Sequence, residues 1–229
     1  MRASGGHTDC QEVLYRTVFR RNPPDKTRWP AYKSAFRLPP VSQSRIDDVV
    51  AGALTWTEVD LVNIHDSSSR PLRDALEEFG IRVHYHPVGQ PRHIVTALGS
   101  DRTVAPFVVL GCHGDEGRIL LPELGEPIAS DQPFNGLLGP DEVRRHLRLP
   151  GSFVVSIGCE TGRPELAEAF LDAGAVGYFA PQEAPDGHVA FLVALLFFYE
   201  LTGGMAAVEA AQRARRYDAA THMWRLWSR

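Results

Sequence analysis

The chain has 229 residues, of which 44% are hydrophobic, and this is enough to bury one large core. Its formal net charge is −4, but residues 1–45 carry nine basic and three acidic residues, whereas residues 46–229 carry 15 basic and 25 acidic ones. An acidic body lacks the basic face that a nucleic-acid-binding domain needs, so the charge distribution argues against a nucleic-acid partner.

Residues 1–45 predict an extended basic arm. Five prolines with arginines between them break both helix and sheet. Trp29, Tyr32 and Phe36 are spaced for one short amphipathic turn. We expect this arm to pack on the acidic body through contacts that weaken with salt, or to bind a partner protein.

From residue 46 onward, strand and helix patterns alternate in one domain, residues 46–229. Apolar runs predict strands over residues 59–64, 81–85, 107–111, 153–157 and 175–180, with a small hairpin around residues 119–121. Apolar spacings of three and four predict helices over residues 71–79, 93–98 and 164–173, another from residue 140, and two after residue 186. This alternation predicts an α/β fold with a mostly parallel central sheet flanked by helices.

The compartment follows from the cysteines and from the hydropathy pattern. Three cysteines are too few for a disulfide framework and favour a reducing environment. The N-terminus has no apolar stretch typical of a signal peptide. Val189 to Tyr199, the most apolar stretch, has 11 residues, whereas a membrane span needs about 20. We expect a soluble, cytoplasmic protein with no membrane partner.

Two segments 46 residues apart carry the chemistry. An apolar run from Phe107 leads to His113, and a second run from Phe153 leads to Cys159, with glycines flanking both side chains. In a parallel α/β sheet, ligands bind beyond the carboxyl ends of the strands. We therefore expect His113 and Cys159 to meet there as base and nucleophile.

A cysteine hydrolase also needs two N–H donors for the oxyanion of its tetrahedral intermediate. Gly114 lacks a Cβ, so its N–H can approach a bound carbonyl closely. The N–H of Cys159 is the natural second donor. Gly158 and Gly162 permit the sharp turn that would lift the thiol clear of the sheet.

Other reactive side chains have weaker support. Cys112 continues a strand and is expected in the core, and a zinc site from Cys112, His113 and Cys159 lacks a fourth ligand at a typical spacing. His84 and His86 share one strand face, where a solvated edge is the simpler interpretation. The other two histidines considered are His65, which follows a strand, and His188, at a helix start. No phosphate-binding loop, dinucleotide fingerprint or serine elbow occurs, so we expect no cofactor and no metal.

These motifs resemble the caspase-like cysteine peptidases, most closely the CHAT group, whose relatives include separase, metacaspases and gingipains. The histidine-before-cysteine order and spacing match those of caspases. The helix and Gly-Ala turn over Glu165–Ala175, then Asp186 and the helix pair ending in Glu209-Ala210-Ala211, are also similar to CHAT domains. The resemblance spans roughly residues 59–217 and implies a caspase-like sandwich and a peptidase in which His113 and Cys159 are catalytic.

The sequence departs from this pattern at the nucleophile. It has Ile157-Gly158-Cys159-Glu160-Thr161 in place of the caspase signature, and Gly158 stands where many metacaspases have aspartate. Strict aspartate specificity is therefore not implied. Acidic residues instead follow three strand ends and predict cleavage after Arg or Lys. These residues are Asp115, Glu116, Glu160, Glu183 and Asp186, with Asp186 as the expected pocket floor and Asp115 or Glu160 at the rim.

The leading hypothesis is a cysteine endopeptidase that cleaves a protein partner. The alternative is a catalytically silent caspase-like scaffold or regulatory module, which would lack a reactive thiol at Cys159. A small-molecule hydrolase or acyltransferase with the same dyad would have a closed pocket instead of an open groove.

Overall fold

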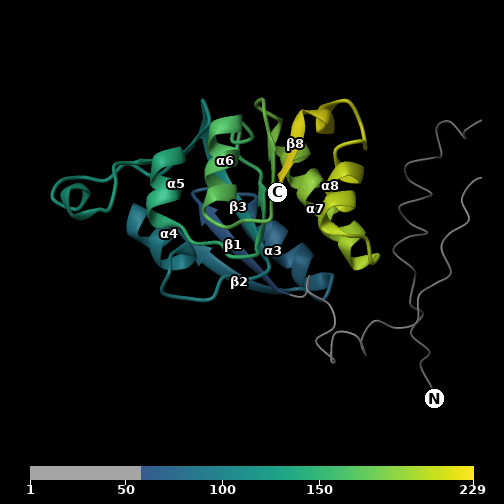
Figure 1. Ribbon diagram of the computed structural model, residues 1–229, viewed down its shortest axis with the longest axis horizontal. Coiled ribbons are helices and arrows are strands. Elements are labelled where there is room, and N and C mark those ends of the chain that lie inside the picture. The colour runs from purple at the N-terminus through teal and green to yellow at the C-terminus, as the bar shows by residue number, and fades with distance from the viewer. Residues whose placement is uncertain (1–57) are drawn as a thin grey trace, which may run out of the picture. The chain divides into compact units, whose positions relative to one another are not determined.

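The structure is a computed structural model that describes residues 58–229 (Figure 1). The predicted arm, residues 1–45, and the predicted start of the body lie outside the described residues. The predictions of arm docking and of a partner bound by the arm therefore stay predictions.

A twisted central sheet organises the described part of the chain, and its strands run in the order β2-β1-β3-β6-β7-β8. These strands are β1 (Glu58–Ile64), β2 (Arg82–Pro87), β3 (Phe107–Asp115), β6 (Phe153–Ser156), β7 (Gly177–Pro181) and β8 (Trp224–Ser228). The first five are parallel to one another, and β8 pairs antiparallel with β7. The predicted α/β class with a mostly parallel sheet is confirmed.

Helices cover both faces of this sheet (Figure 1). One face packs against α4 (Pro91–Leu98), α5 (Pro140–His146) and α6 (Pro164–Asp172). The other packs against α3 (Ser69–Glu78), α7 (Gly187–Thr202) and α8 (Ala207–Ala214). The central strands are buried on both faces, which explains why their sequences are continuous apolar runs without alternation.

The strand that carries His113 is longer than the sequence predicts. Its parallel pairing with β1 ends at Cys112, yet β3 continues to Asp115 and turns back into β4 (Arg118–Leu120). β4 in turn pairs with β5 (Leu137–Leu138). His113 is therefore held inside a strand, because an antiparallel hairpin extends the sheet past the point where the parallel ladder stops.

The last strand, β8, was not predicted from the sequence. The short 3₁₀ helix η3 (Ala220–Met223) leads into it, and Trp224, its first residue, is fully buried. The indole Nε1 of Trp224 donates a hydrogen bond of 3.3 Å to the carbonyl oxygen of Ser156. β8 thus forms one edge of the sheet, and its Trp224 supports the end of β6, where the loop that carries Cys159 begins.

A buried ionic cluster links β1, β2 and the segment that leads into β3. Asp60 is fully buried on β1, where its carboxylate lies 2.7 Å from His86 Nε2 and accepts a 2.9 Å hydrogen bond from Arg102. Burial alone would raise the pKa of Asp60, but hydrogen bonds from His86, Arg102 and the Ala105 N–H outweigh it and lower that pKa. His86 therefore has a structural partner within the fold.

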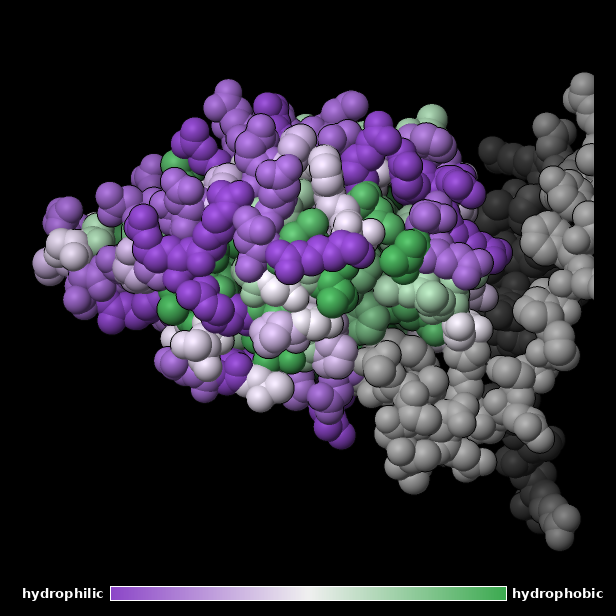
Figure 2. Space-filling view, viewed as in Figure 1, coloured by the Kyte–Doolittle hydropathy of each residue, from purple (hydrophilic) through white to green (hydrophobic). Residues whose placement is uncertain are grey.

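Hydrophilic residues cover most of the face shown in Figure 2, and a smaller hydrophobic area lies near its centre. Within residues 58–229, no helix is both long and apolar enough to cross a membrane. The apolar stretch from Val189 to Tyr199 lies within α7, and seven residues of this helix belong to the core.

Candidate functional site

A cavity of about 580 Å³ lies beyond the carboxyl ends of the parallel strands. Its walls come from Cys112 and His113 of β3, from the segments that follow β1, β6 and β7, and from the first turns of α3 and α7. This is the edge at which an α/β sheet binds ligands, because the strand ends and helix starts leave polar groups there.

Both residues that the sequence singles out line this cavity. His113 projects from β3 and is exposed, and Cys159 follows β6 and is half-buried. Cys159 is a free thiol. The structure therefore brings together an accessible imidazole and an accessible thiol, as the two strand-end motifs predict, and their catalytic roles remain a proposal.

Glycines allow the two segments to approach closely. A Cβ on Gly114 would overlap the carbonyl oxygen of Cys159 and lie 2.6 Å from the Thr161 methyl carbon. A Cβ on Gly158 would lie 2.6 Å from the Sγ of Cys112. Any side chain at either position would push the cysteine loop away from β3. These glycines are therefore required by packing between the two motifs.

Hydrogen bonds fix the loop that carries Cys159. The Thr161 hydroxyl donates to the Gly158 carbonyl oxygen at 2.8 Å and lies 2.8 Å from the Ser156 hydroxyl. Glu160 has a left-handed φ of 55°, a conformation that non-glycine residues adopt only when their surroundings impose it. Its N–H donates to the Glu183 carbonyl oxygen at 3.0 Å. The backbone on both sides of the thiol is thus held by β6 and by the loop after β7.

Cys112 lies in the core, as predicted. Its side chain is buried and its Sγ lies 3.7 Å from the Ser156 hydroxyl. Burial raises the pKa of the Cys112 thiol to about 12, and the Ser156 hydrogen bond offsets only part of this effect. A thiol with that pKa is protonated at neutral pH, so Cys112 is a poor nucleophile.

The three predicted substrate-binding acids do not line the cavity. Asp115 ends β3 opposite Arg118, Glu160 forms an ion pair with Arg163, and Asp186 precedes α7 as its exposed N-cap residue. Their roles stay predictions. Asp186 has neighbours on both sides, Pro185 and Gly187, in the cavity wall.

The sequence reasoning missed one acid that does line the cavity, Asp66. Its carboxylate accepts hydrogen bonds from the hydroxyls of Ser68 and Ser69, at 2.7 and 2.8 Å. Its position directly after β1 was the available signal, because β1 and β3 end at the same edge. His188 also lines the cavity, whereas His65 does not. No group of three or more His, Cys, Asp or Glu side chains suited to a metal ion occurs within residues 58–229.

No protein-family model matches the chain, and no curated protein matches it. Among solved structures, the Arg-specific cysteine proteinase gingipain R is similar, with a TM-score of 0.52 and 13% identity over 76% of this chain and 46% of that chain. A complex of the pro- and mature domains of RgpB from Porphyromonas gingivalis has a TM-score of 0.51 at 12% identity, over 76% of this chain and 47% of that chain. The fold is caspase-like.

This chain spans less than half the length of either gingipain chain. The separase–securin complex of Saccharomyces cerevisiae is also similar, with a TM-score of 0.47 and 10% identity over 75% of this chain and 12% of that chain. The described part of the protein shares its fold with the two gingipain structures, and the cavity lies at the strand ends of that fold.

Proposed function

We propose that this protein is a cysteine endopeptidase that uses His113 and Cys159 to cleave a protein or peptide substrate. The observation that supports this function is the shared cavity, which an exposed histidine and a half-buried free thiol both line on a protease scaffold. We propose that the enzyme is close to the CHAT group, because its sequence motifs resemble those of CHAT domains. We place it in the cytoplasm because its cysteines at 112 and 159 are free.

The chemistry begins when His113 takes the proton of the Cys159 thiol. The thiolate attacks the substrate carbonyl carbon, and the N–H groups of Gly114 and Cys159 donate hydrogen bonds to the resulting oxyanion. Collapse of the intermediate breaks the carbon–nitrogen bond, and His113 returns its proton to the leaving amine. Water then hydrolyses the thioester, which releases the acid and restores the thiol.

Substitution of the dyad tests this function. Cys159→Ala and His113→Ala should each abolish proteolysis, with losses of at least about 10³-fold, because these residues act as a unit. Both variants should unfold at the same urea concentration as the wild type. Cys112→Ala is the matched control: it removes a thiol next to the same site and should keep activity.

Alkylation distinguishes between an active enzyme and a catalytically silent scaffold. Iodoacetamide should modify Cys159 of the native protein, identified by peptide mass, and this modification should stop cleavage. Full turnover by Cys159→Ala would contradict the dyad. A wild-type protein that neither reacts at Cys159 nor cleaves any peptide in a broad library would instead support the scaffold or regulatory module.

We further propose cleavage after Arg or Lys. An arginine fork pairs well with a carboxylate, and a cavity lined by one sign of charge attracts the opposite sign. Asp66 lines the cavity, and Asp186 adjoins its wall between Pro185 and Gly187. Asp115, which ends β3 two residues after His113, and Glu160, which follows Cys159, would act at the rim.

A peptide library varied at the residue before the cleaved bond tests this specificity. Arg or Lys should be selected, and replacing that residue by the uncharged isostere citrulline should lower kcat/KM at least tenfold. The variants Asp66→Asn and Asp186→Asn identify which carboxylate binds the basic side chain of the substrate. Only the variant that lacks this carboxylate should lose the preference for Arg or Lys over citrulline. Selection of Asp or of an apolar residue would overturn the proposal while leaving the dyad intact.

A further inference from the structure

His113 belongs to a row of three exposed side chains that crosses the hairpin extension of β3. In the antiparallel pairs of this extension, His113 is opposite Leu120, and Leu120 is opposite Leu137. Residues directly opposite one another in antiparallel strands point to the same face of the sheet. The row therefore runs from the proposed general base across β4 to β5.

The other face of the same hairpin is buried. Ile119 is 0% exposed and Leu138 is 1% exposed, and both belong to the core beside α5 and α6. Leu120 and Leu137, one residue away on each strand, are 37% and 38% exposed. Alternation along a strand normally places polar residues on an exposed face. Burial in the core does not account for two large apolar side chains on this exposed face, next to His113.

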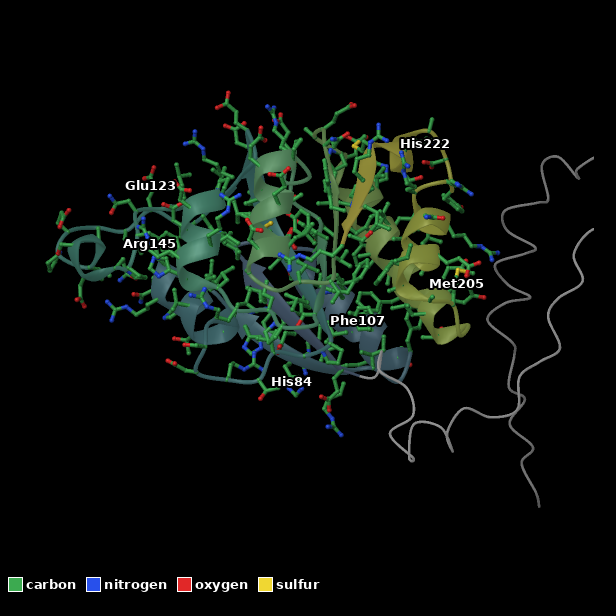
Figure 3. The ribbon with its side chains drawn as sticks, viewed as in Figure 1. His84, Phe107, Glu123, Arg145, Met205 and His222 are labelled. Atoms are coloured by element: carbon green, nitrogen blue, oxygen red, sulfur yellow. The ribbon has the colours of Figure 1, made fainter. Side chains whose placement is uncertain are left out.

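A cavity of about 670 Å³ continues this row, and both leucines line it. Its remaining walls come from residues 121–136, the segment that connects β4 to β5 and projects beside α5 (Figures 1 and 3). Figure 3 labels Glu123 in this segment, and that residue also lines the cavity. The surface beyond His113 is therefore a concave, largely apolar site with two acidic wall residues, Glu123 and Glu126.

We propose that this surface, the Leu120–Leu137 site, binds the part of the substrate that follows the cleaved bond and selects apolar residues there. The inference rests on the proposed function. His113 must give its proton to the leaving amine, so the chain that continues from that nitrogen starts next to His113. The dyad cysteine lies on one side of His113, along β6, and the hairpin extends on the other. The leaving segment is thus directed over β4 and β5.

The spacing of the strands and the length of an extended peptide determine at which substrate positions this site should select residues. Opposite residues of an antiparallel pair are separated by about 5 Å, and an extended peptide advances about 3.3 Å per residue. Leu120 then lies within reach of the first or second residue after the cleaved bond. Leu137, about 10 Å from His113, lies near the third.

The experiment uses the full chain and internally quenched peptides that share one sequence before the cleaved bond. The three positions after the bond are varied in turn among Leu, Ser and Asp. For the wild type, Leu at one of the first two positions should give at least tenfold higher kcat/KM than Ser, and Asp should be poorest. Leu120→Ser and Leu137→Ser should each reduce the Leu-to-Ser ratio at the position they contact to less than threefold.

Ile128→Ser is the matched control. Ile128 is an exposed apolar residue of the same connecting segment, at 52%, but it does not line the cavity. Its substitution should leave the Leu-to-Ser ratio as in the wild type. A wild-type enzyme that cleaves the peptides without apolar preference after the bond would overturn this inference alone, as would leucine variants with an unchanged ratio. A wild type that cleaves no peptide, with Cys159 unreactive, would overturn the proposed function as well.

Discussion

Cys112 lies within β3 and Cys159 follows the neighbouring strand β6, and the surroundings of the two thiols differ in the property that controls thiol chemistry. Cys112 points into the core, where no solvent stabilises a thiolate and its pKa rises to about 12. Both cysteines border the cavity that His113 lines, but Cys112 is buried whereas Cys159 is half-buried. A nucleophile needs both access and a base, so position relative to the sheet edge determines which thiol can react.

The buried thiol makes the stability of the protein dependent on pH in the alkaline range. The Cys112 thiol ionises near its ordinary value of 9.0 in the unfolded chain and only near 12 in the folded protein. Its contribution is fully present below pH 9 and is lost as the pH rises from 9 toward 12, at about 1.4 kcal/mol per pH unit.

Urea unfolding at several pH values between 7.5 and 10.5 measures this effect. The wild type should lose more free energy of unfolding above pH 9 than Cys112→Ala. Burial, and next the neighbouring Cys112, raise the pKa of Tyr178, so the difference between the two proteins measures Cys112 together with its effect on Tyr178. Parallel pH profiles for the two proteins would contradict the assignment.

The sequence was sufficient to predict that His113 and Cys159 border one site, because an apolar run followed by a glycine-flanked polar residue marks a strand end, and both residues line the same cavity. It was not sufficient for the acids. Asp66, Glu160 and Asp186 all follow strands, but the direction of each side chain depends on loop contacts. Arg163 pairs with Glu160, and the hydroxyls of Ser68 and Ser69 hold Asp66. Such contacts lie within loops whose backbone path no periodicity predicts.

At the scale of elements, strongly apolar strands were predictable and short edge strands were not. β3, β6 and β7 are buried on both faces, so their sequences carry a clear signal. β5 has only two residues, and in β8, at the edge of the sheet, only Trp224 is buried while the other four side chains are half-buried or exposed. β5 and β8 are strands because they pair with β4 and β7. The residue pattern of one short segment contains little information about the segment with which it pairs.

The hairpin formed by β3 and β4 has consequences for the proposed mechanism. A histidine on a free loop would be held by its own backbone only, whereas His113 is held in register with Leu120. Catalytic groups on rigid elements keep their geometry better than those on loops. The same pairing aligns the two exposed leucines with His113, so one element positions the base and supplies the proposed binding surface.

At the scale of the whole molecule, the sheet separates two cores, and the site lies at the edge where both end. The core between the sheet and α7 contains a cluster of phenylalanine rings. Phe197 of α7 lies at its centre, with ring centroids 5.1 to 6.1 Å from those of four other phenylalanines. These are Phe107, Phe153, Phe179 and Phe198. Figure 3 shows Phe107 in the interior, between the sheet and the helices.

Substitution of Phe197 tests how strongly α7 is held by this cluster. Phe197 is fully buried, so Phe197→Ala should lower the free energy of unfolding by about 3–5 kcal/mol, through lost burial and the cavity left behind. Tyr199→Ala is the matched control on the same helix. Tyr199 is 61% exposed and its ring is tilted against that of Phe79, with centroids 6.4 Å apart, so its loss should cost less than about 1 kcal/mol. Urea unfolding of both variants gives the comparison, and equal losses would show that the cluster does not anchor the helix.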